Sequence, residues 1–378
     1  MRILAIDASS ANKAQRSGVE WYAFHLIQAM KARALAEGER VVLFSPTPLV
    51  GLLAELPSGW ESRVLKWWLP MGWMKGRVGW EMLRRAPSVL FVPAQGLPLF
   101  GKNLVATIHD VGFRRIPAFY EPKQRRVLER STRSAVRRSK RLFAVSEFTK
   151  REIVSGFPGT SVPLADRIVV TPNAVNRDVY RKLDDASVAP VLQKHRLGRH
   201  FFLYVGRMDA KKNVKTLIRA FELFKQGRGL GDPYELVLVG SPGFKFFEIR
   251  QYIERSPFAA SIKYLGYLPD DESAALMNAA TAFAFPSWYE GFGVPPLEAA
   301  ACGAPLIVSD IAAHREVFGD AAVFVAPGEP ESWAKALRTV AVEKNVADEL
   351  RAKGFLRVAA YSWEKSAAVA WETLRSLV

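Results

Sequence analysis

The stretch YEGFGVPPLEAAACGAPLIVSD (289–310) joins a glycine-rich loop, a proline pair and an apolar run. Gly291 and Gly293 allow backbone amides to approach a ligand closely, and the prolines at 295–296 favour the first turn of a helix. Gly303 suits the end of that helix, and the apolar run APLIVSD then predicts a strand. Loop, helix and strand in this order are the repeating unit of a doubly wound α/β sheet.

Short apolar runs that end in turn residues recur along the whole chain. Because these runs are apolar at nearly every position, they predict strands buried on both faces of a parallel sheet. Ligands of such sheets lie beyond the carboxyl ends of the strands. The expected strands are 2–9, 40–46, 88–94, 104–110, 141–146, 168–173, 201–206, 235–240, 262–267, 281–287, 304–310 and 321–327, and helices are expected at 19–35 and 122–139.

A polar stretch, NRDVYRKLDDASVAPVLQKHRLGRH (176–200), interrupts this rhythm, which restarts at FFLYVG (201–206). A chain of 378 residues is long enough for two domains of ordinary size. The predicted fold class is therefore α/β, with two doubly wound, Rossmann-like domains at 1–180 and 181–360. The last segment, 361–378, is helical in pattern.

Most of the net charge of +16 lies in the first half of the chain. Residues 1–180 contain 28 Lys and Arg against 14 Asp and Glu, whereas residues 181–378 contain 25 against 23. Such an excess indicates an acidic partner, which could be nucleic acid, an anionic membrane or a phosphorylated substrate. The only cysteine, Cys302, excludes an intrachain disulfide, and the chain opens directly on a strand-like run, so we expect a cytoplasmic protein.

Charged residues follow two predicted strands of the second domain. Arg207 and Lys212 come after the run 201–206, and both side chains are suited to phosphate oxygens. Glu290 lies in the glycine loop, and we expect Glu298 in the first turn of the following helix, ionised and able to bind a vicinal diol such as ribose. The competing interpretation is a solvated basic loop and a helix-start glutamate favoured only by the helix dipole.

GRMDAKKN (206–213) and PSWYEGFGVPPLEAAACGAPLIVSD (286–310) together resemble glycosyltransferase family 4, the retaining nucleotide-sugar enzymes of GT-B fold. The Glu-x7-Glu spacing from Glu290 to Glu298 is the most specific mark of this family. The resemblance implies two Rossmann-like domains that face each other across a cleft, with the nucleotide sugar held mainly by the C-terminal domain. It also implies that the last helix, 361–378, packs back on the first domain, and that no metal or other cofactor is needed.

The resemblance assigns roles in the second domain by position. Arg207 and Lys212 would bind the diphosphate, and Glu290 would face hydroxyls of the donor sugar. The backbone of Phe292 and Gly293 would also face the sugar, and the amide of Val294 would bind a phosphate. Glu298 would bind the ribose diol, and Tyr267 and Leu268 would lie near the base.

Two motifs of the first half also match the family. In RSGVEWY (16–22), Gly18 would bring its amide to the diphosphate, although Ser17 stands where the family often has a second glycine. In TIHDVGF (107–113), His109 would sit beside the donor sugar. Together with Glu290, Arg207 and Lys212, His109 completes the predicted catalytic set. Ser146 in VSEFTKREI could lie near the acceptor, but this pattern also fits a helix cap.

The first half is rich in tryptophan as well as in basic residues. Four of the ten tryptophans fall in KWWLPMGWMKGRVGWEMLRR (66–85), and KQRRVLERSTRSAVRRSKR (123–141) crowds Lys and Arg onto a helix. Tryptophan with Lys and Arg is typical of a membrane interface, so an anionic membrane is a candidate partner through these two segments. The alternative is that the tryptophans line a core or an acceptor cleft and the charges are solvated.

The sequence thus predicts a retaining, metal-independent hexosyltransferase, with GDP-mannose as the favoured donor and a glycan or lipid-linked acceptor of cell-surface polysaccharide synthesis at the inner face of the plasma membrane. A nucleotide-sugar epimerase of the same fold is the closer alternative. A nucleic-acid-binding protein is disfavoured because no recognised motif supports it. A glycosidase with Glu290 and Glu298 as acid and nucleophile is rejected because their surroundings suit a diphosphate and because Glu298 is expected to stay ionised. The Asp pairs at 184–185 and 270–271 are interpreted as solvated loops.

Overall fold

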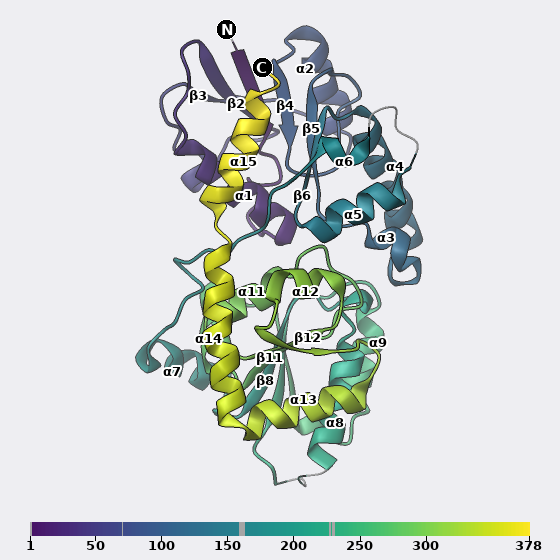
Figure 1. Ribbon diagram of the computed structural model, residues 1–378, viewed down its shortest axis with the longest axis vertical. Coiled ribbons are helices and arrows are strands. Elements are labelled where there is room, and N and C mark those ends of the chain that lie inside the picture. The colour runs from purple at the N-terminus through teal and green to yellow at the C-terminus, as the bar shows by residue number, and fades with distance from the viewer. Residues whose placement is uncertain (1, 70, 159–162, 227, 229–230) are drawn as a thin grey trace. The chain divides into compact units, whose positions relative to one another are not determined.

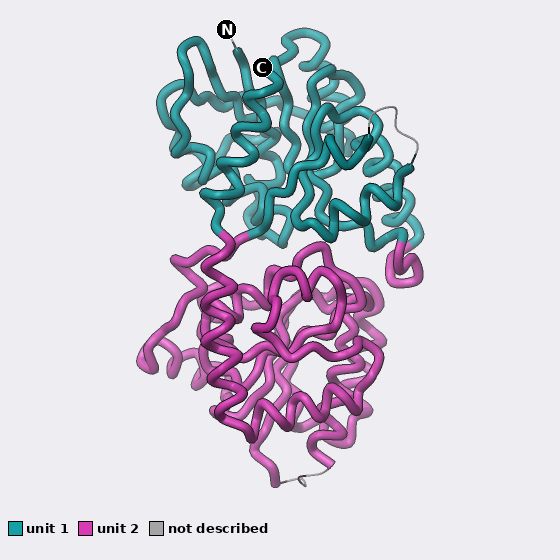
Figure 2. Tube along the Cα trace, viewed as in Figure 1, with its two compact units in different colours: residues 1–114, 122–173, 362–378 teal, residues 115–121, 174–361 magenta. Residues whose placement is uncertain are grey.

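A computed structural model describes residues 2–69, 71–158, 163–226, 228 and 231–378. The chain divides into two compact units, which Figure 2 colours separately. The first unit comprises residues 1–114, 122–173 and 362–378, and the second comprises 115–121 and 174–361. Residues 115–121 and 174–180, placed in the first domain by sequence, group with the second unit.

The first unit is built on a parallel sheet of seven strands among the described residues, in the order β3-β2-β1-β4-β5-β6-β7 (Figure 1). The central strands β1, β4 and β5 are buried along nearly their whole length, as their apolar sequences require. The strands are β1 (Arg2–Asp7), β2 (Glu39–Ser45), β3 (Trp60–Val64), β4 (Val89–Val92), β5 (Leu104–Ile108), β6 (Arg141–Ala144) and β7 (Ile168–Val170).

Helices cover this sheet, beginning with α1, whose first turn is fixed by a capping box between Ser17 and Glu20. Ser146 caps α5 by accepting a hydrogen bond from the Thr149 amide at 2.9 Å, so the helix-cap interpretation of this serine is confirmed. The helical segments of this unit are α1 (Gly18–Lys31), η1 (Gly51–Leu53), η2 (Met74–Val78), α2 (Gly79–Arg84), α3 (Gly112–Arg115), α4 (Pro122–Arg138), α5 (Glu147–Gly156), α6 (Leu164–Arg167) and α15 (Trp363–Arg375), whereas η3 (Pro117–Phe119) groups with the second unit.

The second unit contains a parallel sheet of six strands among its described residues, in the order β10-β9-β8-β11-β12-β13. The strands are β8 (Phe201–Val205), β9 (Glu235–Val239), β10 (Ile262–Gly266), β11 (Ala282–Phe285), β12 (Leu306–Ser309) and β13 (Ala322–Val325). The helical segments are α7 (Asp185–Lys194), η4 (Ala210–Lys212), α8 (Val214–Gln226), α9 (Phe246–Glu254), η5 (Ala259–Ser261), α10 (Asp270–Ala279), α11 (Val294–Ala301), α12 (Ala312–Phe318), α13 (Pro330–Val342) and α14 (Lys344–Ala360).

The prediction of two doubly wound parallel sheets is confirmed, with two local corrections. The polar stretch 176–200 is not only a connection, because it contains α7. The Asp pairs are not solvated loops: Asp184 caps α7 by accepting a bond from the Ser187 amide at 2.8 Å, and Asp270 and Asp271 begin α10. Both pairs stand where acidic groups stabilise the positive end of a helix.

The last helix, α15, belongs to the first unit, where it packs beside α1 (Figure 1). The Trp371 ring stacks on the Trp60 ring at 6.2 Å, and the Ser366 hydroxyl donates a hydrogen bond to the Pro172 carbonyl at 2.7 Å. None of the described helices is long and apolar enough to cross a membrane.

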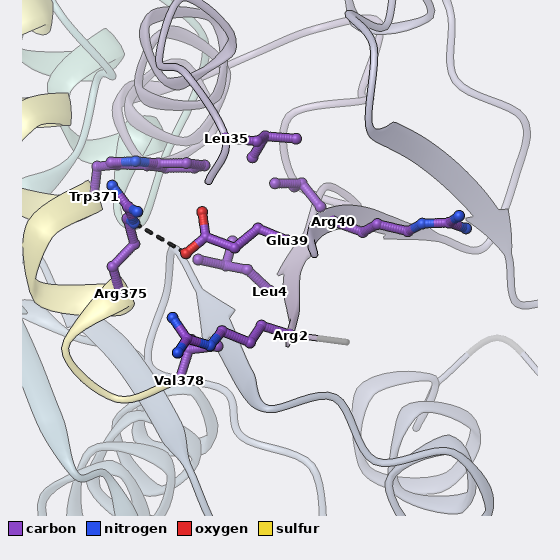
Figure 3. Close-up of a pocket in the computed structure, with 9 residues that line it drawn as sticks. Arg2, Leu4, Leu35, Glu39, Arg40, Trp371, Arg375 and Val378 are labelled. Carbon is purple, nitrogen blue, oxygen red and sulfur yellow. Dashed lines mark hydrogen bonds and ion pairs between the residues drawn. The ribbon is translucent and has the colours of Figure 1, made fainter. Parts of the chain in front are cut away.

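A small pocket lies between α15 and the first residues of β1 and β2 (Figure 3). Arg2, Glu39, Trp371 and Arg375 are among its lining residues, and Arg375 pairs with Glu39 at 3.1 Å. Because this pocket lies at the amino ends of the strands, it is on the edge of the sheet opposite to the one where α/β sheets bind their ligands. The candidate site lies elsewhere.

Candidate active site

The site in the second unit lies where the strand order reverses. The first strand of the unit, β8, has β9 on one side and β11 on the other, so the loops that follow β8 and β11 leave in opposite directions. Gly240, at the end of β9, approaches the Gly206 carbonyl so closely that a Cβ there would meet it at 1.9 Å. The glycine therefore allows the loop after β8 to lie against the neighbouring strand end.

The loop after β8 carries the predicted phosphate-binding cations. Arg207 is exposed, and Lys212 ends the short helix η4, which is capped by Asp209. Asn213 follows in the left-handed conformation, with φ of 57°. Its side-chain amide donates hydrogen bonds to the carbonyls of Pro286, at 3.1 Å, and Pro327, at 2.6 Å. Asn213 thus fastens this loop to the ends of β11 and β13.

The loop after β11 brings Glu290 to Lys212. The Trp288 amide donates a hydrogen bond to the Lys211 carbonyl at 2.9 Å, which joins the two loops through their backbones. The Lys212 ammonium then contacts the Glu290 carboxylate at 2.6 Å, and both side chains are largely buried. Two residues that the sequence assigns to phosphate and to sugar therefore meet in one ion pair.

The cations around Glu290 keep its carboxylate ionised. Burial alone would raise the pKa of Glu290, but the charges of Lys212 and Lys211 and the nearby Ser287 hydroxyl outweigh burial and lower it. This hydroxyl lies beside the carboxylate but makes no hydrogen bond of ordinary geometry. An ionised carboxylate at a strand end can accept hydrogen bonds from sugar hydroxyls.

The glycine loop ends in a turn that opens α11. Gly293 is the N-cap residue, with φ of 100°, a backbone conformation that residues other than glycine rarely adopt. Pro295 and Pro296 follow in the first turn, and Gly303 lies just past the helix end with φ of 81°, so both predictions are confirmed. The amides of Phe292, Gly293 and Val294 precede the prolines, where a helix N-terminus favours an anion.

Glu298 differs from its prediction in place and in charge. It lies in the second turn of α11 rather than the first, because the helix begins at Val294. Burial, and then the negative charge of Asp270, raise the pKa of Glu298 to about 8, although part of its residue surface still reaches solvent. This raised pKa contradicts the expectation that Glu298 is ionised at neutral pH. A helix N-terminus acts only over its first turn, so it does not offset burial here.

Tyr267 and Leu268 follow β10, two strands away from β8. Tyr267 is half exposed and Leu268 is buried, so an exposed ring and an apolar surface stand at this strand end. Their assignment to the surroundings of the base stays a prediction.

The two predicted residues of the first unit lie at the carboxyl edge of its own sheet. Gly18 is the first residue of α1 and has open space around its Cα. The His109 Nε2 lies 3.0 Å from the Pro93 carbonyl, and the Tyr22 ring of α1 packs edge-on against the imidazole at 4.9 Å. Burial lowers the pKa of His109, so the ring is neutral, donates from Nε2 and leaves Nδ1 as an acceptor.

Several residues that shape the second unit's site are absent from the sequence-based set. Asn213 and Trp288 fasten the loops that carry predicted residues, and the charges of Asp270 and Glu290 act on Glu298 and His314, respectively. The turn at Asn213 could have been predicted, because Asn often adopts the left-handed conformation that ends a helical turn. The other three, Trp288, Asp270 and His314, give no local pattern, because the residues on which they act lie in other segments of the chain. Among the described residues, no group of three or more His, Cys, Asp or Glu could hold a metal ion.

A doubly wound unit with two cations, a helix N-terminus and an ionised carboxylate at its switch point is suited to phosphorylated, hydroxyl-rich ligands. Residues 192–357 match the family model "Glycosyl transferases group 1", and residues 16–179 match "Glycosyltransferase Family 4". O-antigen chain mannosyltransferase B of Escherichia coli is 33% identical over 290 residues, which are 76% of this chain and 74% of that protein. The chain therefore belongs to the group 1 glycosyltransferases of family 4, and it is a hexosyltransferase.

Solved structures agree with this assignment at the level of the fold. Sucrose-phosphate synthase from Thermosynechococcus elongatus superposes with a TM-score of 0.78 at 18% identity, covering 100% of this chain and 99% of that one. The Anabaena protein HepE, solved with UDP and glucose, gives a TM-score of 0.73 at 18% identity, with 100% of each chain covered. The predicted family and GT-B fold are confirmed.

Proposed function

We propose that this chain transfers mannose from GDP-mannose to a glycan acceptor during synthesis of a cell-surface polysaccharide, with retention of configuration. One observation carries the proposal: the Lys212–Glu290 pair lies at the switch point, beside the amides that open α11. The choice of mannose and of a polysaccharide acceptor is supported by the similarity to an O-antigen chain mannosyltransferase.

In the proposed complex, the diphosphate lies against cations and amides that the chain already holds in place. Lys212, Arg207 and the amides near Val294 receive its oxygens. Glu290 accepts hydrogen bonds from the sugar, and Glu298 binds the ribose diol. The bond between the sugar C1 and the diphosphate breaks, the acceptor oxygen bonds to C1 on the same face, and the acceptor proton leaves with the nucleoside diphosphate. Donors placed in advance stabilise the charge that develops on the leaving group.

A thermal-shift panel tests the donor most directly, using GDP, UDP and ADP and their sugars. A ligand at a hundred times its Kd raises the free energy of unfolding by about 2.7 kcal/mol. We expect the largest shift with GDP-mannose and its loss in Lys212→Ala. The matched control is Lys215→Ala, since Lys215 makes an exposed ion pair with Glu248.

The thermal shifts test both the phosphate role of Lys212 and the identity of the donor. Equal shifts in both lysine variants would contradict the phosphate role of Lys212, and a larger shift with a UDP or ADP sugar would replace the donor. A separate incubation of the enzyme with the nucleotide sugar and no acceptor tests the epimerase alternative, which release of an epimerised or free sugar would favour.

We also propose that the enzyme works on an anionic membrane surface, and exposed apolar side chains of the first unit favour this. Trp68 and Met71 are 85% and 82% exposed. The full set, called here the tryptophan patch, is Trp68, Leu69, Met71, Trp80, Leu83, Leu99 and Phe100. An apolar set of this size, rimmed by polar residues, typically marks an interaction surface.

Contacts join the three segments of the tryptophan patch into one surface. The Trp67 indole donates a hydrogen bond to the Met71 carbonyl at 2.9 Å and packs so closely on Gly76 that no Cβ would fit there. Leu99 and Phe100 cover Gly79 at the start of α2, which carries Trp80 and Leu83.

The surroundings of the tryptophan patch are positively charged. The only acidic residue between positions 66 and 102 is Glu81, which is buried and paired with Arg63 and Arg77. The exposed charges near the patch are Lys66, Lys75, Arg84, Arg85 and Lys102. Helix α4 adds exposed Arg and Lys, and Arg138 at its end bonds to the carbonyls of Pro98 and Leu99. Apolar and basic groups together match an anionic bilayer surface.

Co-sedimentation with vesicles tests this surface, using phosphatidylcholine with and without phosphatidylglycerol at low and high salt. We expect binding to anionic vesicles that weakens with salt, and a loss of about tenfold or more in Trp68→Ser/Met71→Ser, because burying such a side chain stabilises by about 1.5–3 kcal/mol. The matched control is Leu356→Ser, a 74% exposed residue of α14. Equal recovery with neutral and anionic vesicles, or equal loss in both variants, would contradict the proposal.

A further inference from the structure

A buried histidine outside the predicted set lies beneath the glycine turn. His314 of α12 has no exposed surface, and its Nδ1 lies 2.9 Å from the Ser309 carbonyl at the end of β12. Because a carbonyl only accepts hydrogen bonds, Nδ1 carries the proton of the neutral ring. The other nitrogen, Nε2, is then an acceptor, and it has no hydrogen-bond partner among the described residues. An apolar side chain would fill this place without an unsatisfied atom, so the imidazole calls for an explanation.

The ring faces Gly293 directly. A Cβ on Gly293 would lie 3.1 Å from Cδ2 and 3.2 Å from Nε2 of His314, tighter than an ordinary contact. Phe285 and Phe318 flank the imidazole, with ring centroids at 5.9 and 5.6 Å. The ring is therefore held between two aromatic side chains and the backbone of the turn that opens α11.

The charged groups that act on this imidazole are the two members of the ion pair, Glu290 and Lys212. Burial lowers the pKa of His314 to about 4, with Lys212 acting in the same direction and Glu290 in the opposite one. The ring is therefore neutral at the pH of a cell. A cation at this place would compete with Lys212 for the Glu290 carboxylate.

We propose that His314 is a positioning residue for recognition of the donor sugar. Its ring supports the left-handed turn at Gly293, and its uncharged Nε2 leaves the Glu290 carboxylate to Lys212 and to the bound sugar. This inference rests on the proposed donor site, and it assigns His314 an effect on the sugar rather than on the nucleotide.

Two substitutions separate the two nitrogens of the ring. In His314→Asn the side-chain amide reaches the place of Nδ1 and can keep the bond to Ser309, whereas nothing stands at Nε2. In His314→Gln the longer amide reaches the place of Nε2. The matched control is Val317→Ala, which removes buried volume from the same helix without touching a polar group.

We expect His314→Asn to raise the KM for the nucleotide sugar about tenfold and to lower kcat, while its Kd for the free nucleoside diphosphate changes less than threefold. His314→Gln should recover part of the lost activity. Val317→Ala should lower the melting temperature without raising the KM for the nucleotide sugar relative to the Kd for the free diphosphate. An equal loss of affinity for the nucleotide sugar and the free diphosphate, or unchanged kinetics in His314→Asn, would overturn the proposal.

Nitrogen-15 NMR of the histidine rings gives a second readout, because the chain has only five histidines. We expect the neutral Nδ1–H form of His314 throughout pH 5–8, and a shift of its Nε2 signal when the nucleotide sugar binds but not when the diphosphate alone does. An imidazole that titrates within this range would overturn the proposal. If no nucleotide sugar binds the wild-type chain, the proposed donor site itself fails, and the pH series still reports the state of His314.

Discussion

Glu290 and Glu298 lie eight residues apart, and their pKa values are shifted in opposite directions. Lys212 and Lys211 lower the pKa of Glu290 despite its burial, whereas burial and Asp270 raise that of Glu298 to about 8. The proposed roles use this difference, because the sugar site then carries the permanent charge and the ribose site a carboxyl that can change its protonation. Both positions were predictable from sequence, but their charges depend on side chains from η4 and α10.

Replacing Glu298 should change how stability depends on pH. Between about pH 4.5 and pH 8 the folded chain keeps a proton on Glu298 that the unfolded chain releases, so stability falls as pH rises through this window. In Glu298→Gln that contribution is absent, and its melting temperature should exceed that of the wild type by a margin that grows from pH 5 to pH 8.

The measurement is calorimetry of both proteins across this range. Asp7, whose pKa burial raises to about 6, gives a slope of the same sign in each protein, so the difference isolates Glu298. Parallel curves for the two proteins would show that Glu298 has an ordinary pKa.

At the scale of elements, the uniformly apolar strands were predictable and the less regular ones were not. All twelve predicted strands are present with ends shifted by a few residues, but β3 (Trp60–Val64, sequence WESRV) was missed. It is an edge strand with polar residues, so it lacks the continuous apolar run that marks the others. Helix α7 was not predicted, because its sequence is mostly polar and only Val188 and Leu192 of it are buried.

The contact of α15 with the first unit can be tested by one substitution. Trp371 is 3% exposed and stacks on Trp60, so Trp371→Ala should lower the free energy of unfolding by about 3–5 kcal/mol. The control is Val369→Ala on the same helix, where the side chain is 41% exposed. Denaturant unfolding of both variants gives the comparison, and similar midpoints would mean that Trp371 does not anchor α15.

At the scale of the whole chain, the two units differ in charge and in proposed task. The excess of basic residues lies in the first half, which contributes most of the first unit with its tryptophan patch, whereas the second unit carries the Lys212–Glu290 pair. The charge asymmetry and the donor motifs were predictable from sequence. The apolar surface was not, because exposure decides whether a tryptophan is core or interface: Trp333 is fully buried and Trp68 is not.

The central claim is that the Lys212–Glu290 site retains the configuration of a hexose while transferring it from a nucleoside diphosphate. The most direct measurement is NMR of the anomeric centre of the product formed from GDP-mannose and a mannosylated acceptor, with rates for wild type and Lys212→Ala. We predict a glycoside with the anomeric configuration of the donor, and a rate at least about a hundredfold lower in Lys212→Ala. An inverted product, or a near-normal rate in that variant, would contradict the account.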